Sequence, residues 1–207
     1  MYEKRAQRTE ISELGEFGLI KRITKDIPVK NTTTVKGIGD DAAVMEFKDK
    51  QTLLSSDMLI EGINFDLTYF PLKHLGYKAA VSNFADIHAM NGTPSQITVN
   101  IAISNRFAVE AIEEIYSGVQ LACDTYKVDF VGGDTSSSPH SLFLSISVAG
   151  YAEKDDIIYR NGAKENDLLC VSGDLGAAYM GLLILEREKQ AFKANPNMQP
   201  DLSGNDY

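Results

Sequence analysis

The sequence predicts an α+β fold in which a mixed or antiparallel sheet carries helices on one face. Segments with the apolar alternation of strands occur between segments with helical spacing. Their order is strand, strand, helix, strand, helix, strand, strand, which is not the strict alternation that builds a parallel sheet. The length of 207 residues, with 43% hydrophobic and 24% charged residues, is sufficient for a globular core.

The N-terminal part is expected to contain a loose arm, one helix and three strands. Residues 1–12 are polar and form the arm, and the spacing of Leu14, Phe17 and Ile20 predicts a helix over Leu14–Ile23. The strands expected next are Val35–Gly39, Ala42–Phe47 and Gln51–Ser56, the last two joined by a turn at 48–50. The sequence Ser-Ser-Asp at 55–57 is therefore expected at a strand end, where a side chain can reach a ligand.

The middle of the chain is expected to continue with helices and strands in turn. Helical spacing predicts a helix over Leu75–Ala89, which stops at the Asn91-Gly92 turn. The elements expected after it are a strand at Ile97–Ile103, a helix at Val109–Tyr126 and strands at Val128–Val131 and Leu142–Tyr151. Residues 13–152 are therefore expected to form one N-terminal domain.

A second unit is expected over residues 153–207. The pattern predicts a strand at Asn166–Ser172 and, after a glycine turn, a helix at Ala177–Arg187. One strand and one helix cannot bury a core of their own. The sequence thus predicts the truncated start of a C-terminal α/β domain.

Composition excludes several classes of function. A formal net charge of −9 argues against sequence-independent nucleic-acid binding, which needs a basic face. The longest apolar run, Leu142–Ala152, is too short to span a bilayer, and no apolar signal core follows the charged N-terminus. We therefore expect no membrane contact and a cytoplasmic location. The two cysteines, Cys123 and Cys170, have apolar flanks that predict buried free thiols rather than a disulfide.

Four short acidic segments carry the strongest chemical signal. They are Gly-Ile-Gly-Asp-Asp at 37–41, Ser-Ser-Asp at 55–57, Asn-Phe-Ala-Asp at 83–86 and Gly-Gly-Asp-Thr at 132–135. Each places Asp beside small residues, where a turn can bring carboxylates together. Carboxylates repel one another unless a cation lies between them, and hard oxygen ligands of this kind favour Mg²⁺. The segments therefore predict phosphoryl transfer organised by Mg²⁺.

The glycines of these segments favour phosphate binding of a particular kind. Residues 37–42 nearly fit a dinucleotide-binding fingerprint, but the residues that follow predict a strand where that motif needs a helix. No P-loop or protein-kinase motif set is present in the sequence. At 132–135 the two glycines would let backbone N–H groups approach a phosphate, while Asp134 holds the bridging metal.

Taken in order, seven segments between Glu13 and Arg187 resemble the thiamine-monophosphate kinase family, which is related to aminoimidazole ribonucleotide synthetase. These segments are 15–17, 37–42, 55–62, 77–87, 132–135, 160–164 and 171–176. The resemblance implies ATP-dependent phosphorylation of thiamine monophosphate to thiamine pyrophosphate, by direct transfer assisted by Mg²⁺. It also implies a homodimer whose sheets pair into a barrel.

The resemblance also implies roles for individual residues. Its metal-ligand positions fall on Asp41, Ser55, Ser56, Asp57, Asp86 and Asp134. Of these, Asp57, Asp86 and Asp134 are the expected catalytic residues. Its ATP contacts fall on Gly133, Asp134, Arg160 and Tyr116, and its substrate contact falls on Asn64.

Two departures from the family leave alternatives open. Asn64 stands where the family usually has His, and the family's C-terminal Asp-x-Ser-Asp-Gly metal segment has no counterpart after Arg187. Another ATP-dependent synthetase of the same superfamily, or an inactive nucleotide-binding fragment, therefore stays open beside the kinase.

Overall fold

The computed structural model describes residues 18, 21, 34–36, 39–47 and 50–197. The expected arm at 1–12 and most of the expected helix over Leu14–Ile23 lie outside the described residues. The strands are β1 (Thr34–Lys36), β2 (Ala43–Phe47), β3 (Lys50–Ile60), β4 (Thr93–Ile103), β5 (Asp129–Ser137) and β6 (Phe143–Ala152). The helices are α2 (Leu72–Ala89), α3 (Val109–Tyr126), the short 3₁₀ turn η1 (Lys154–Asp156) and α4 (Ala177–Ala194).

The six strands form one mixed sheet in the order β1-β2-β3-β6-β4-β5. All neighbouring pairs are antiparallel except β4 and β5, which run parallel. A parallel pair needs a crossover connection, and α3 supplies it. The mixed sheet that the sequence predicts is therefore confirmed.

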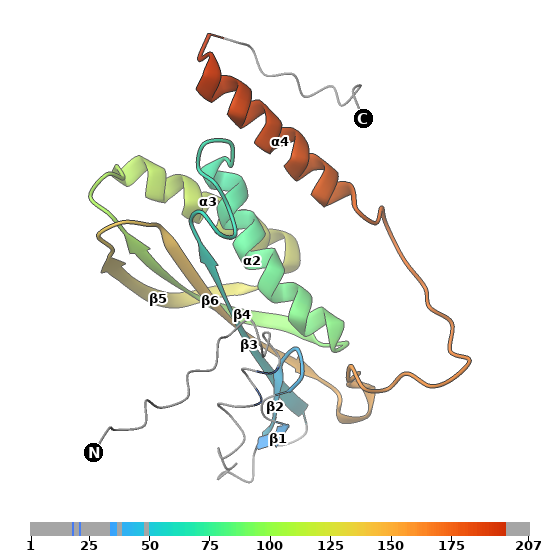
Figure 1. Ribbon diagram of the computed structural model, residues 1–207. Coiled ribbons are helices and arrows are strands. Elements are labelled where there is room, and N and C mark those ends of the chain that lie inside the picture. Colours follow the sequence, from blue (N-terminus) through green and yellow to red (C-terminus); the bar gives the residue numbers. More distant parts are fainter. Residues whose placement is uncertain (1–17, 19–20, 22–33, 37–38, 48–49, 198–207) are drawn as a thin grey trace, which may run out of the picture.

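Helices α2 and α3 lie together on one face of the sheet, as Figure 1 shows. Alternate residues of the central strands, such as Leu53, Val99 and Ile146, point toward these helices and are fully buried. The opposite face of the sheet, here called the outer face, has no covering helix among the described residues. On it Leu54 and Met58 are 41% and 56% exposed, so this face carries apolar side chains in contact with solvent.

The two covering helices approach each other through glycines. A Cβ built on Gly118 of α3 would overlap the carbonyl oxygen of Lys73 and lie 2.8 Å from the backbone nitrogen of Tyr77. A Cβ on Gly76 of α2 would overlap the carbonyl oxygen of Ile115 in the same way. Only glycine allows the two backbones to come this close, so this contact sets the spacing between α2 and α3.

The two strands that carry acidic motifs are longer than expected. Strand β3 continues past Asp57 to Ile60, so Ser-Ser-Asp lies inside the strand rather than at its end. Strand β5 likewise runs through Gly-Gly-Asp-Thr to Ser137, and this segment is not a turn. Long antiparallel pairing with β6 extends β3, and parallel pairing with β4 extends β5. Backbone pairing outweighs the weak strand propensity of Ser, Gly and Asp here.

The expected strand at Asn166–Ser172 is wrong. These residues form turns and irregular backbone, and Leu168 and Leu169 are 90% and 95% exposed. The burial expected for Cys170 is also wrong, because its side chain is exposed, whereas Cys123 is buried as expected. A strand needs a neighbouring strand for its backbone hydrogen bonds, and no described strand pairs with this segment.

Helix α4 lies apart from the core, beside the loop that leads into α2 (Figure 1). It runs to Ala194, seven residues beyond the expected end at Arg187, and contains no fully buried residue. Within the described part of the chain, no helix has the length and apolar character needed to cross a membrane.

Candidate functional site

Four of the expected metal ligands, three aspartates and Ser55, come together where β2, β3 and α2 meet. Asp41 precedes β2, Asp57 lies on the helix-facing side of β3, and Asp86 lies near the end of α2. The hydroxyl of Ser55 donates a 2.6 Å hydrogen bond to Asp86 Oδ2 and also lies 3.2 Å from the carbonyl oxygen of Asp41. Ser55 thus ties two of the acidic segments to each other, and we call Asp41, Asp57 and Asp86 the carboxylate site.

The buried side chain of Asn83 fixes α2 against β3 beside these residues. Its amide oxygen accepts a 3.1 Å hydrogen bond from the backbone N–H of Asp57, and its amide nitrogen donates to the carbonyl oxygen of Ala79 at 3.0 Å. A fully buried amide with both ends bonded is held in one orientation. The backbone around Asp57 is therefore positioned by the same helix that carries Asp86.

The electrostatics of the carboxylate site favour a bound cation. Burial raises the pKa of Asp86 above its usual value, and the negative charges of Asp57 and Asp41 raise it further. The hydrogen bond from Ser55 and the positive charge of Arg160 act in the opposite direction and favour the ionised form. Asp57 and Asp41 therefore lie close enough for their charges to act on Asp86, and a cation would relieve that repulsion.

Arg160 lies at the mouth of this site. It belongs to the irregular segment after η1, and its guanidinium pairs with the carboxylates of both Asp40 and Asp41. Sequence reasoning assigned Arg160 to the nucleotide but missed its contact with Asp40. The sequence Gly-Asp-Asp does not indicate which of its two carboxylates faces an arginine that is distant in the sequence.

The donor chemistry of the carboxylate site fits Mg²⁺. Within the described residues, no group of three or more His, Cys, Asp or Glu side chains is already arranged to hold a metal ion. Magnesium does not require such a prearranged group, because it keeps several waters and commonly takes one or two protein carboxylates together with substrate phosphates. Asp41, Asp57 and Asp86 supply oxygen donors of that kind.

The remaining expected nucleotide contacts form a second group at the far edge of the sheet. Gly133 lies against β4, where a Cβ would stand 2.7 Å from the carbonyl carbon of Val99, so only glycine fits. The ring of Tyr116 of α3 packs in a tilted geometry against that of Phe130 of β5, with 5.8 Å between the ring centroids. Burial raises the pKa of Tyr116, while a hydrogen bond with Thr135 lowers it. The structure therefore brings Tyr116 to the Gly-Gly-Asp-Thr strand.

Asp134 does not lie beside the carboxylate site within one chain. Asp57 pairs with Ile146, which pairs with Val99, which pairs with Gly133. Three strand spacings of about 4.8 Å therefore separate the two groups by roughly 14 Å. Asp134 itself pairs with Asn100, whose side chain is on the outer face. The hydroxyl of Ser56 is also on that face, bonded to Ser147 at 3.0 Å.

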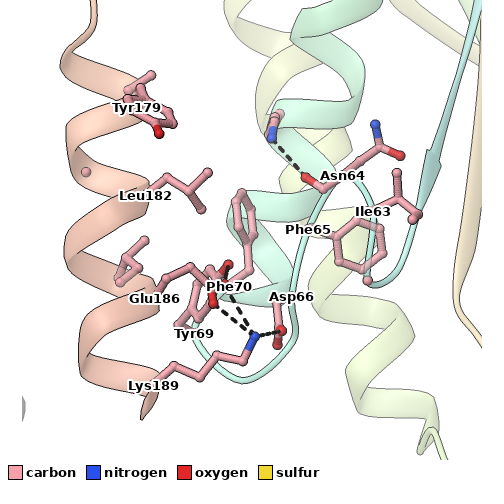
Figure 2. Close-up of a pocket in the computed structure, with 15 residues that line it drawn as sticks. Ile63, Asn64, Phe65, Asp66, Tyr69, Phe70, Tyr179, Leu182, Glu186 and Lys189 are labelled. Carbon is pink, nitrogen blue, oxygen red and sulfur yellow. Dashed lines mark hydrogen bonds and ion pairs between the residues drawn. The ribbon is translucent and has the colours of Figure 1, made fainter. Parts of the chain in front are cut away.

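Asn64 lines a pocket between the loop after β3, helix α2 and helix α4 (Figure 2). The pocket has a volume of about 870 Å³. The amide oxygen of Asn64 accepts a 2.9 Å hydrogen bond from the backbone N–H of Ile60, which fixes the side chain. Lys78 donates to the carbonyl oxygen of Asn64 at 3.3 Å from the other side. The expected substrate residue thus lies at a concave surface.

A polar network that sequence reasoning missed ties α4 across this pocket. Lys189 donates to Asp66 Oδ2 at 2.6 Å, and Tyr69 donates to Glu186 Oε1 at 2.6 Å (Figure 2). Burial together with the hydrogen bond to Glu186 raises the pKa of Tyr69 to about 12. The partners in this polar network are more than one hundred residues apart in the sequence, and no local sequence pattern predicts such a pairing.

The tie between α4 and the pocket is expected to depend on pH. The hydrogen bond from Lys189 lowers the pKa of Asp66 from 3.8 to about 2. Because the folded-state pKa is lowered, the tie contributes fully above pH 3.8 and is lost as the pH falls through about 2. Carboxylate NMR titration should show Asp66 titrating near pH 2, and Lys189→Met should move that value toward 3.8.

The control for this titration is Lys154→Met, which removes an exposed partner of Glu46 and leaves the pocket untouched. An Asp66 pKa that stays low without the Lys189 ammonium would contradict the assignment of this cation as its main partner.

Residues 39–152 match the family described as AIR synthase related protein, N-terminal domain, and the chain belongs to this family. Curated relatives of the chain include thiamine-monophosphate kinases. The protein of Aquifex aeolicus is 37% identical over 183 residues, and that of Bacillus subtilis is 34% identical over 176 residues. These matches cover 88% and 84% of this chain but 56% and 54% of the relatives, so the chain spans about half their length.

Solved structures agree with the sequence comparison. The structure of AaThiL complexed with AMPPCP and TMP matches with a TM-score of 0.78 and 35% identity, over 90% of this chain and 57% of that chain. Thiamine-monophosphate kinase of Aquifex aeolicus matches with a TM-score of 0.70 and 32% identity, over 88% of this chain and 57% of that chain. A Thermus thermophilus protein at 21% identity supports the fold alone, with a TM-score of 0.74.

Proposed function

We propose that this chain provides the nucleotide-binding and metal-binding part of an ATP-dependent thiamine-monophosphate kinase. The reaction is transfer of the γ-phosphoryl group of ATP to thiamine monophosphate, which gives thiamine pyrophosphate. The observation that carries the proposal is the convergence of Asp41, Asp57 and Asp86 beside Arg160 in a chain related to such kinases. AaThiL was solved with AMPPCP, an analogue of ATP, and with TMP, which matches both proposed substrates.

Each group at the carboxylate site has a distinct task in this proposal. Asp41, Asp57 and Asp86 would hold Mg²⁺, which when bound neutralises phosphate charge and orients the transferring group. Arg160 offers a forked guanidinium to the same phosphates. Ser55 holds Asp86 in place through its 2.6 Å hydrogen bond. No side chain here needs to act as a nucleophile, since transfer between two phosphates is governed by positioning and charge.

The pocket beside Asn64 suits the proposed acceptor. Thiamine carries a positively charged aromatic ring, and this pocket combines aromatic rings with carboxylates. The lining side chains of these two kinds are Phe65, Tyr69, Phe70, Tyr179, Asp66 and Glu186. The aromatic faces attract a cation, whereas the carboxylates of Asp66 and Glu186 already pair with Lys189. Asn64 is neutral where a histidine is usual in the resembling family, so it would contribute a hydrogen bond and no charge.

We also propose that two copies of the chain pair through the outer face of the sheet. That face exposes Leu54, Met58 and Tyr151, and uncovered apolar strands of this kind are typical of interfaces. Asp134 lies on the same face, so it would lie near the interface between the two copies. A cytoplasmic location belongs to the same proposal.

The direct test is formation of thiamine pyrophosphate from ATP, Mg²⁺ and thiamine monophosphate by this chain, followed by chromatography. We expect product that requires Mg²⁺ and disappears with EDTA. Calorimetry with AMPPCP, with and without Mg²⁺, reports nucleotide binding separately from transfer. Absence of both product and Mg²⁺-dependent AMPPCP binding would contradict the proposed function.

A nucleotide-binding module without transfer activity is the second candidate, and one observation favours it. The segment from Leu168 to Leu183 exposes a series of apolar side chains that no described element covers. A chain that binds AMPPCP with Mg²⁺ but forms no thiamine pyrophosphate would support this candidate over the kinase.

A further inference from the structure

We propose that Asp40 is a positioning residue that holds Arg160 over the carboxylate site, while Asp41 is a partner that Arg160 exchanges for ligand. This inference rests on the proposed function, because it assigns the ligand as Mg²⁺ and nucleotide phosphate. Its first step concerns only the three side chains and can be tested without either ligand.

The two aspartates differ sharply in exposure. The side chain of Asp40 is 1% exposed, whereas those of Asp41 and Arg160 are 36% and 41% exposed. Asp40 Oδ1 lies 3.5 Å from Nε of Arg160 and also accepts a 3.1 Å hydrogen bond from the backbone N–H of Asp41. A carboxylate removed from solvent is strongly destabilised when its cation is taken away. Asp40 is therefore expected to keep Arg160 in every state of the site.

Asp41 is in the opposite situation. Its carboxylate pairs with a terminal nitrogen of Arg160, and it is open to solvent. Its negative charge also acts on Asp86. In the absence of a metal ion, the guanidinium offsets part of the negative charge of this site. A metal ion and the guanidinium would compete for the carboxylate of Asp41.

The shape of arginine allows the exchange without loss of the anchor. The guanidinium has five N–H donors in a rigid plane, so one edge can stay with a carboxylate while the other turns to a phosphate. With Nε held by Asp40, the terminal nitrogen released from Asp41 would remain within reach of the same site. Binding of metal and phosphate would then exchange partners around Arg160 rather than displace it.

Trypsin cleavage after Arg160 tests the anchor directly. The enzyme must take up the side chain of this residue, so a held guanidinium slows cleavage relative to Lys164, an exposed site in the same irregular segment. In the ligand-free chain we expect Asp40→Asn to raise the ratio of cleavage at 160 to cleavage at 164 at least about 5-fold. Asp41→Asn should raise it less, about 2-fold. Asp155→Asn makes the same charge change in η1 and should leave the ratio unchanged.

A second variant tests the same contact if Asp40→Asn does not fold. Arg160→Lys keeps the charge and the trypsin site but loses the fork, so cleavage at position 160 should also rise. Circular dichroism of each variant checks the fold. An unchanged ratio in Asp40→Asn and Arg160→Lys, or a larger effect from Asp41→Asn than from Asp40→Asn, would overturn the inference.

Calorimetry with AMPPCP and Mg²⁺ then tests the consequence for ligand binding. We expect Asp40→Asn to weaken binding about 10-fold, and to add nothing when combined with Arg160→Ala, because both changes remove the same directed guanidinium. Additive effects of the two changes would overturn the inference. If the parent chain binds no AMPPCP, the proposed function fails while the cleavage ratios still decide whether Asp40 holds Arg160.

Discussion

Gly118→Ala is expected to lower the free energy of unfolding by about 3 kcal/mol or to prevent folding altogether. The new methyl group would overlap the carbonyl oxygen of Lys73 and lie 2.8 Å from the backbone nitrogen of Tyr77. Both atoms belong to the backbone of α2, so no side chain can move aside. The variant must therefore separate α2 from α3, and the buried residues of both helices would lose contacts.

Urea unfolding followed by circular dichroism measures this effect, with Gly181→Ala as the matched control. Gly181 lies within α4 and has no atom within 4 Å of a built Cβ. Alanine favours a helix interior by roughly 0.5–1 kcal/mol over glycine, so this control should be neutral or stabilising. Gly118→Ala with an unfolding midpoint equal to that of the parent would show that α2 and α3 do not touch at this point.

The same variant is expected to affect the carboxylate site at a distance. Helix α2 carries Asp86 and also Asn83, which holds the backbone of Asp57. A displacement of α2 would therefore move the carboxylates of Asp57 and Asp86 relative to that of Asp41. The fold and the carboxylate site therefore both depend on the close contact between α2 and α3 that Gly76 and Gly118 allow.

The elements with clear periodicity could be predicted from the sequence. The residues of α3 were predicted with the same bounds as those found, and α2 with the same C-terminal end, because apolar residues recur at helical spacing in both. The ends of β3 and β5 could not be predicted, since Ser, Asp and Gly have low strand propensity. Pairing with neighbouring strands overrides that propensity, and pairing is not visible in a single segment.

The candidate site was predictable in its chemistry and only partly in its geometry. Asp57 and Asp86 were expected together, and Ser55 joins the segments that carry them. The face on which Asp134 lies depends on the register between β4 and β5, which shifts between Ile97 and Thr98. A shift of one residue moves a side chain to the other face of a sheet, so local sequence could not place Asp134.

Asp86→Asn is expected to have opposite effects on ligand binding and on stability. Burial and the neighbouring charges of Asp57 and Asp41 raise the pKa of Asp86, so its ionised form is disfavoured in the folded chain. A neutral amide has the same shape, still accepts the hydrogen bond of Ser55 and carries no charge. The unfolding midpoint at pH 7 should therefore rise. Since the folded-state pKa is raised, the parent should gain stability as the pH falls through that pKa, and the variant should not.

Ligand binding should respond in the other direction, because the same charge is what a divalent cation needs. We expect Asp86→Asn to weaken Mg²⁺-dependent AMPPCP binding on the order of 100-fold, measured by calorimetry. Asp124→Asn on α3 is the control, because its exposed carboxylate bonds only to Gln120 among the described hydrogen bonds. A variant that is both more stable and fully competent to bind would mean that Asp86 is not a metal ligand. Weaker binding together with higher stability would show that the negative charge of Asp86 serves ligand binding and lowers the stability of the fold.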